Sequence, residues 1–152
     1  MAYSTIEGRQ QLLDALAEAI DEIGYALASL TAAYEQLDHA TADALEEQLF
    51  GPVQRGYGRG KRTHSAFAER AGLETSDFAQ GSAGRPSTGA KGFIDNAAAA
   101  IGAADGKLAG LQDLPELLEV GDQQLRKDLS ELRELIGPVP HSARELTRRL
   151  GR

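Results

Sequence analysis

Residues 6–37, IEGRQQLLDALAEAIDEIGYALASLTAAYEQL, carry the pattern that decides the fold. A strand requires an apolar residue at every second position, whereas a period of about 3.5 residues is that of a helix that buries one stripe. The stretch therefore predicts a long amphipathic helix over residues 5–39. After Ile6, the apolar residues recur at alternating spacings of three and four: Leu13, Leu16, Ile20, Ile23, Leu27, Leu30, Tyr34 and Leu37.

The same spacing returns further along the chain and predicts four more helices. The second of the five helices is weakened near Pro52, which removes a backbone donor, and by the glycines at 56, 58 and 60. Each of these glycines costs a helix about 1 kcal/mol relative to alanine, so we expect a kink or short break there. Asp122 is expected to cap the fourth helix. The predicted ranges are 41–71, 89–111, 122–136 and, for a short C-terminal helix, 142–150.

Residues 72–88, GLETSDFAQGSAGRPST, show no apolar period and predict a long loop. Phe78 either pins this loop to the helices or forms an exposed contact. Helices joined in this way bury their apolar stripes most simply against one another. The sequence thus predicts one all-α domain over residues 1–152, an antiparallel up-down four-helix bundle with a long loop between the second and third helices.

The amino-acid composition limits the kinds of metal site and cross-link that the chain can form. The absence of cysteine excludes disulfides and thiolate metal sites, which leaves His39, His64, His141 and the carboxylates as possible metal ligands. Di-iron bundles use a Glu-x-x-His spacing, but Glu35 precedes His39 by four residues. We therefore predict neither a metal nor a cofactor. No stretch approaches the roughly 20 apolar residues of a membrane span, so a cytoplasmic protein is expected.

Charge is segregated along the chain. The net charge of −7 argues against general nucleic-acid binding, because displacing counterions from phosphates requires a positive surface. Residues 1–50 contain ten acidic residues and one basic residue, Arg9. Residues 51–70 are basic, with Glu69 as the one acid among them. Their basic residues are Arg55, Arg59, Lys61, Arg62 and Arg70.

The segment QRGYGRGKRTH, residues 54–64, is the most distinctive candidate site. Basic side chains beside glycines suit a phosphate or carboxylate, and a tyrosine can stack on a ring. In a helix, Arg55, Arg59 and Arg62 share one side, and Tyr57, Gly60 and His64 turn inward. The alternative is a solvated basic face that pairs with the acidic first helix. The residues of the predicted ligand site are Tyr57, Arg59, Lys61, Arg62 and His64.

His64 has two interpretations of its own. It is either a hydrogen-bonded core residue or a pH-sensitive general base, and the second role requires a partner carboxylate from another helix. No nucleophile elbow or recognisable catalytic arrangement is present, so the sequence does not indicate an enzyme and predicts no catalytic residue.

The function expected from these observations is that of a non-enzymatic interaction or scaffold protein. The first two helices look longer than the others can cover, which favours a homodimer or another protein partner. The alternative is a bundle that binds a small anionic ligand through residues 54–64. A third possibility, binding to a lipid or polymer surface, is disfavoured because interfacial helices usually present lysine and arginine on their polar face.

Overall fold

The computed structural model describes residues 2–150, with side chains from Thr5 onward. Within this range the chain is all-α and contains no strand, as predicted. None of the described helices combines the length and the apolarity that crossing a membrane requires. The longer helices are α1 (Ala2–Tyr34), α3 (Gly51–Ala71), α4 (Gly89–Gln112), α6 (Gln123–Ile136) and α7 (Val139–Leu150). The shorter elements are α2 (His39–Leu45), the π-helical turn η1 (Glu46–Phe50), the 3-10 turn η2 (Pro86–Thr88) and α5 (Pro115–Val120).

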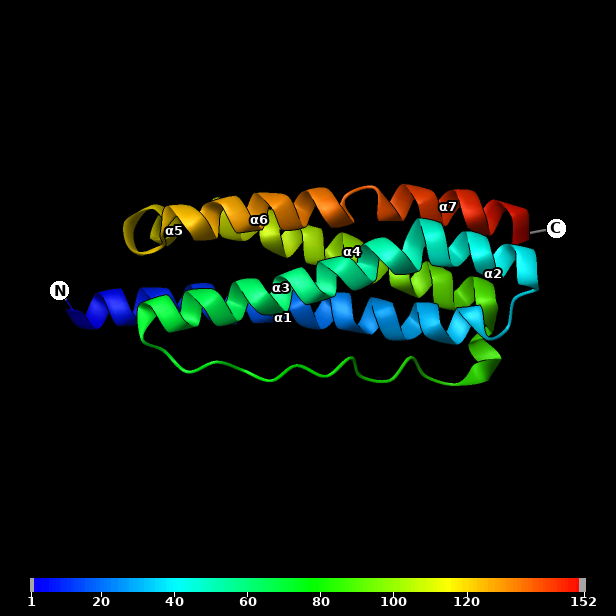
Figure 1. The fold of residues 1–152 in the computed structure, drawn as a ribbon, viewed down its shortest axis with the longest axis horizontal. Helices are drawn as coiled ribbons and strands as arrows, with labels where there is room; N and C mark the ends of the chain where they lie inside the picture. Colours follow the sequence, from blue (N-terminus) through cyan, green and yellow to red (C-terminus); the bar gives the residue numbers. More distant parts are fainter. Residues whose placement is uncertain (1, 151–152) are drawn as a thin grey trace.

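The helices form four columns (Figure 1). The first is α1, the second runs through α2, η1 and α3, the third is α4, and the fourth stacks α5, α6 and α7 end to end. The α1 column packs against α3 and α4, and α6 and α7 cover the other sides of α3 and α4. Each pair of neighbouring columns is antiparallel.

The connection between α3 and α4 departs from the predicted up-down order. Residues 73–85 run back along most of the length of the bundle, so α4 starts at the opposite end from where α3 stops and points in the same direction as α3 (Figure 1). An extended segment of this length reaches about 43 Å, at about 3.3 Å per residue. The α3 helix is only about 32 Å long, at 1.5 Å per residue. The predicted up-down-up-down order is therefore wrong, because the loop is long enough to act as a crossover.

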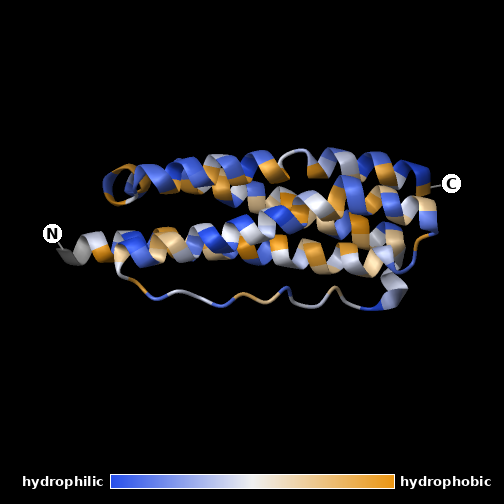
Figure 2. Cartoon of the chain, viewed as in Figure 1, coloured by the Kyte–Doolittle hydropathy of each residue, from blue (hydrophilic) through white to orange (hydrophobic). Residues whose placement is uncertain are grey.

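The core follows the predicted apolar stripe of α1 except at its two ends. Leu13, Leu16, Ile20, Ile23, Leu27 and Leu30 are all at most 3% exposed. Ile6 and Tyr34, which the period also placed in the stripe, are 53% and 41% exposed. Ile6 lies in the first turns of α1, and Tyr34 borders an open space between the end of α1 and η1. The apolar positions of the long helices alternate with hydrophilic ones along each helix (Figure 2).

The expected disturbance at Pro52 takes the form of the π-helical turn η1. The amide of Gly51 donates to the carbonyl of Glu46, five residues earlier, instead of four. A proline inside a helix lacks the amide donor and crowds the carbonyl four residues before it, and a wider turn ahead of it accommodates both effects. The α2–η1–α3 column therefore stays helical from His39 to Ala71, and the predicted break is absent.

Local caps explain most of the shifted helix ends. Asp38 accepts from the amide of Thr41 at 2.8 Å, so the second column starts at His39 and α1 ends at Tyr34 instead of residue 39. Asp122 caps α6 as predicted and accepts from the amide of Leu125 at 2.7 Å. The last helix starts at Val139 instead of residue 142, because a proline in a first turn loses no helical hydrogen bond. The helix α5 was not predicted.

Candidate functional site

Three arginines of α3 line an open groove between α3 and α6. Their spacings of four and three residues place them along one edge of the helix, as predicted. The opposite wall is Leu135 of α6, and Gly58 leaves the floor without a side chain. The groove has a volume of about 330 Å³ and is lined by Gln54, Arg55, Gly58, Arg59, Arg62 and Leu135.

The charges in this arginine groove are only partly neutralised. Arg59 forms an ion pair with Glu131 of α6, and its guanidinium also lies 4.0 Å from the carboxylate of Asp128. Neither Arg55 nor Arg62 has an acidic partner within residues 2–150. The alternative prediction, pairing with the acidic first helix, is wrong for Arg59, because its partner lies on α6. The groove thus holds one anchored guanidinium between two unpaired ones.

The other three residues of the predicted site lie on a different face of α3. Tyr57 is 5% exposed, and its ring packs against Gly24 of α1. The ammonium of Lys61 lies 4.3 Å above the centre of that ring. His64 is 3% exposed and contacts the ring of Phe78 edge to face, with centroids 5.2 Å apart. The five predicted residues therefore do not converge on one ligand.

The crossover loop covers this second face of α3. Phe78 packs on His64, which confirms that Phe78 pins the loop, and the side-chain amide of Gln36 donates to the carbonyl of Pro86 at 2.9 Å. Burial lowers the pKa of His64, an effect that the nearby charge of Asp14 opposes. Burial also raises the pKa of Tyr57, with a further contribution from Asp21.

Neither the hydroxyl of Tyr57 nor Nδ1 of His64 has a hydrogen-bond partner among the described residues. Burying a polar atom without a partner costs about 1–3 kcal/mol. A general base also needs a carboxylate within hydrogen-bond distance to orient it, and Asp14 acts on His64 only through its charge. This face of α3 is closed by the loop and does not form an accessible site.

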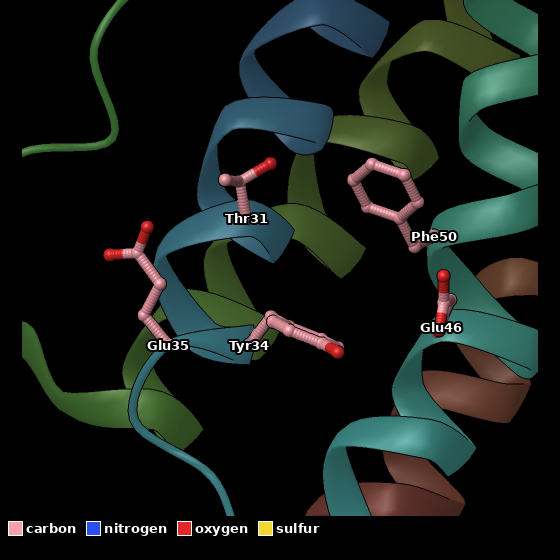
Figure 3. Close-up of a pocket in the computed structure, with 5 residues that line it drawn as sticks. All are labelled: Thr31, Tyr34, Glu35, Glu46 and Phe50. Carbon is pink, nitrogen blue, oxygen red and sulfur yellow. The ribbon is translucent and has the colours of Figure 1, made fainter.

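A second pocket, which sequence reasoning missed, lies between the end of α1 and the turn η1 (Figure 3). The only signal for it in the sequence is the Gly51–Pro52 pair, which forces the wide turn. The pocket has a volume of about 360 Å³. Its lining residues are Thr31, Tyr34, Glu35, Glu46 and Phe50.

The carboxylates and histidines offer no site of metal-binding geometry in the part of the chain that the structure describes. No three such side chains come together between residues 2 and 150. His39 is exposed, and its Nε2 lies 3.6 Å from the carboxylate of Asp43, four residues later in α2.

Comparisons with known proteins place the chain in no family. It matches no family model, and neither a curated protein nor a solved structure matches it significantly.

Proposed function

We propose that this chain is a non-enzymatic binding protein that holds a phosphate or carboxylate group in the arginine groove. The observation that carries the proposal is the pair of guanidiniums, those of Arg55 and Arg62, that line the groove without acidic partners. A guanidinium presents two parallel donors to the oxygens of a carboxylate or phosphate, and such charge-assisted hydrogen bonds are stronger than neutral ones. An anion entering the groove meets unused donors on both sides.

The neighbouring groups support this assignment. The ion pair with Glu131 fixes the guanidinium of Arg59 between the two unpaired arginines. The amide of Gln54 adds a neutral donor, and Leu135 offers an apolar surface to the body of a ligand. The carboxylates of Glu131 and Asp128 limit the net positive charge, which favours a single anionic group over a polyanion such as nucleic acid.

Ligand-induced thermal stabilisation tests the proposal. A ligand that binds only the folded state raises the melting temperature, and the shift grows with the logarithm of the ligand concentration relative to Kd. We expect pyrophosphate at low salt to stabilise the protein and the double variant Arg55→Gln/Arg62→Gln to lose that stabilisation. Each lost charge-assisted contact is worth about 1.5 kcal/mol or more, so the affinity falls at least tenfold per arginine.

The matched control removes two arginines elsewhere. Arg144→Gln/Arg149→Gln changes the net charge by the same amount, and both side chains are exposed on α7. If the control variant loses as much stabilisation as the groove variant, binding follows net charge, and the groove is not the site.

Self-association is a second candidate, favoured by one end of the bundle. Leu118 of α5 is 75% exposed and Ile6 of α1 is 53% exposed, and both lie at the end where α1 begins (Figure 1). The sequence favours self-association on a different basis, the length of the first two predicted helices relative to the others. Sedimentation equilibrium of the wild type and Leu118→Asp distinguishes the cases: a dimer that the aspartate dissociates supports self-association, and a monomeric wild type excludes it.

A further inference from the structure

The pocket at η1 has walls that differ in kind from those of the arginine groove. Tyr34 extends from α1 toward η1, and Phe50 extends from η1 toward α1, so that two aromatic rings border the same space (Figure 3). Glu46 lies on the same side of η1 as Phe50. Glu35 lies at the rim, with its carboxylate directed away from Phe50. The space is thus bordered by two rings and one carboxylate.

The π-helical turn creates this arrangement. The extra residue in the turn leaves Glu46 and Phe50 on one side of the helix while Leu49 points into the core with no exposed surface. π-helical turns occur frequently at functional sites. The turn also keeps the α2–η1–α3 column helical through Pro52, and η1 contacts α1. Tyr34, at 41% exposed, keeps part of its surface open to the pocket.

The charge of the pocket is uncompensated. Neither Glu35 nor Glu46 forms an ion pair among the described residues. All five lining residues come from residues 10–54, a stretch without a single lysine or arginine. The hydroxyl of Thr31 donates to the carbonyl of Leu27 at 3.0 Å, so its free lone pairs add an acceptor. The side-chain oxygens of Thr31 and Glu46 therefore offer acceptors to a ligand in this space.

We infer that the pocket at η1 binds an alkylammonium group. A cation is attracted to the faces of aromatic rings, and a carboxylate beside the rings adds a charge-assisted hydrogen bond. The apolar chain that carries the ammonium packs against Tyr34 and Phe50. Charge complementarity excludes an anionic occupant, and the polar rim disfavours a purely apolar one. The ammonium comes either from a free diamine or from a lysine side chain of a partner protein.

Backbone amide NMR with two pairs of probes tests the inference. We expect putrescine to shift the amides of residues 31–35 and 46–50, and n-butanol, which is similar in size but neutral, to leave them unchanged. N-acetyl-lysine amide is the probe for a protein source. Stronger binding of putrescine assigns a free diamine, stronger binding of the lysine derivative assigns a partner's lysine, and equal shifts with n-butanol overturn the inference.

Three glutamate variants localise the cation. Glu46→Gln should weaken putrescine binding by about fivefold, the scale of a partly exposed charge pair. Glu47→Gln is the matched control, because Glu47 is its exposed neighbour in the same turn but does not line the pocket. Glu35→Gln should have an intermediate effect. Equal weakening by Glu46→Gln and Glu47→Gln contradicts the inference, because the response would then report only the acidity of this region.

Tyr34→Leu tests the contribution of the aromatic rings and leaves the charge unchanged. Unaltered putrescine affinity in that variant also contradicts the inference.

Discussion

Replacing Gly56 by alanine should destabilise the protein although alanine favours a helix. A Cβ atom at Gly56 would lie 2.7 Å from Cγ2 of Ile136 and 3.8 Å from Cδ1 of Leu132. Ile136 is fully buried in the core, so it has little room to move. Forcing a methyl group into a packed core costs about 1–3 kcal/mol, whereas alanine gains about 1 kcal/mol of helix propensity. Since the contact is shorter than a carbon pair tolerates, we expect a net loss of about 1–2 kcal/mol.

The same substitution two residues later should have the opposite sign. A Cβ atom at Gly58 would meet only Nη1 of Arg62, at 3.2 Å, and this flexible end can move aside. The helix gain of about 1 kcal/mol then remains. The two variants should therefore differ by about 2–3 kcal/mol.

Urea unfolding followed by far-ultraviolet circular dichroism measures this difference, because the midpoint moves with stability when the slope is unchanged. Wild type, Gly56→Ala and Gly58→Ala are compared under identical conditions. If both alanines stabilise the protein, α3 does not approach α6 closely at Gly56, and the packing described between the two helices is wrong.

Three further predictions concern His64, Asp122 and Phe78. Because the buried His64 has a pKa below the value of 6.5 for a free histidine, the unfolded chain binds the proton more readily, and the free energy of unfolding should fall as the pH drops below 6.5. In urea unfolding, His64→Gln should remove that part of the pH dependence. Asp122→Ala loses the cap of α6 and the contact with Arg70 at 2.7 Å, which should cost about 1–2 kcal/mol in the same assay, whereas Asp122→Asn keeps the cap and should cost less. Phe78→Ala removes the contact that pins the crossover loop, so elastase should cut within residues 73–85 faster than in the wild type.

The core of the bundle was predictable because burial follows the period of the sequence. The stripe from Leu13 to Leu30 identified both the helix and its buried side. The exposure of Ile6 and Tyr34 was not predictable, because it depends on how closely the neighbouring helices pack at the two ends of α1. The direction of α4 could not be predicted either, since a helical period defines a buried face but not the direction in which the helix runs.

The two proposed binding surfaces differ in how far the sequence reveals them. Helical spacing alone places Arg55, Arg59 and Arg62 on one edge, so the basic wall of the groove was predictable. The pairing of Arg59 with Glu131 was not, because the two residues lie 72 positions apart in the chain. The pocket at η1 forms where the wide turn before Pro52 packs near the end of α1. No local sequence motif predicts that these two segments lie side by side.

NMR of the arginine side chains during a pyrophosphate titration tests the central proposal most directly. The Nε–Hε group of each arginine reports its own hydrogen bonding, so the groove can be separated from the rest of the surface. Binding in the groove predicts saturable shifts for Arg55 and Arg62, with Arg144 and Arg149 unchanged. Uniform, unsaturable shifts of all four arginines would show only ionic screening and would contradict an anion site on α3.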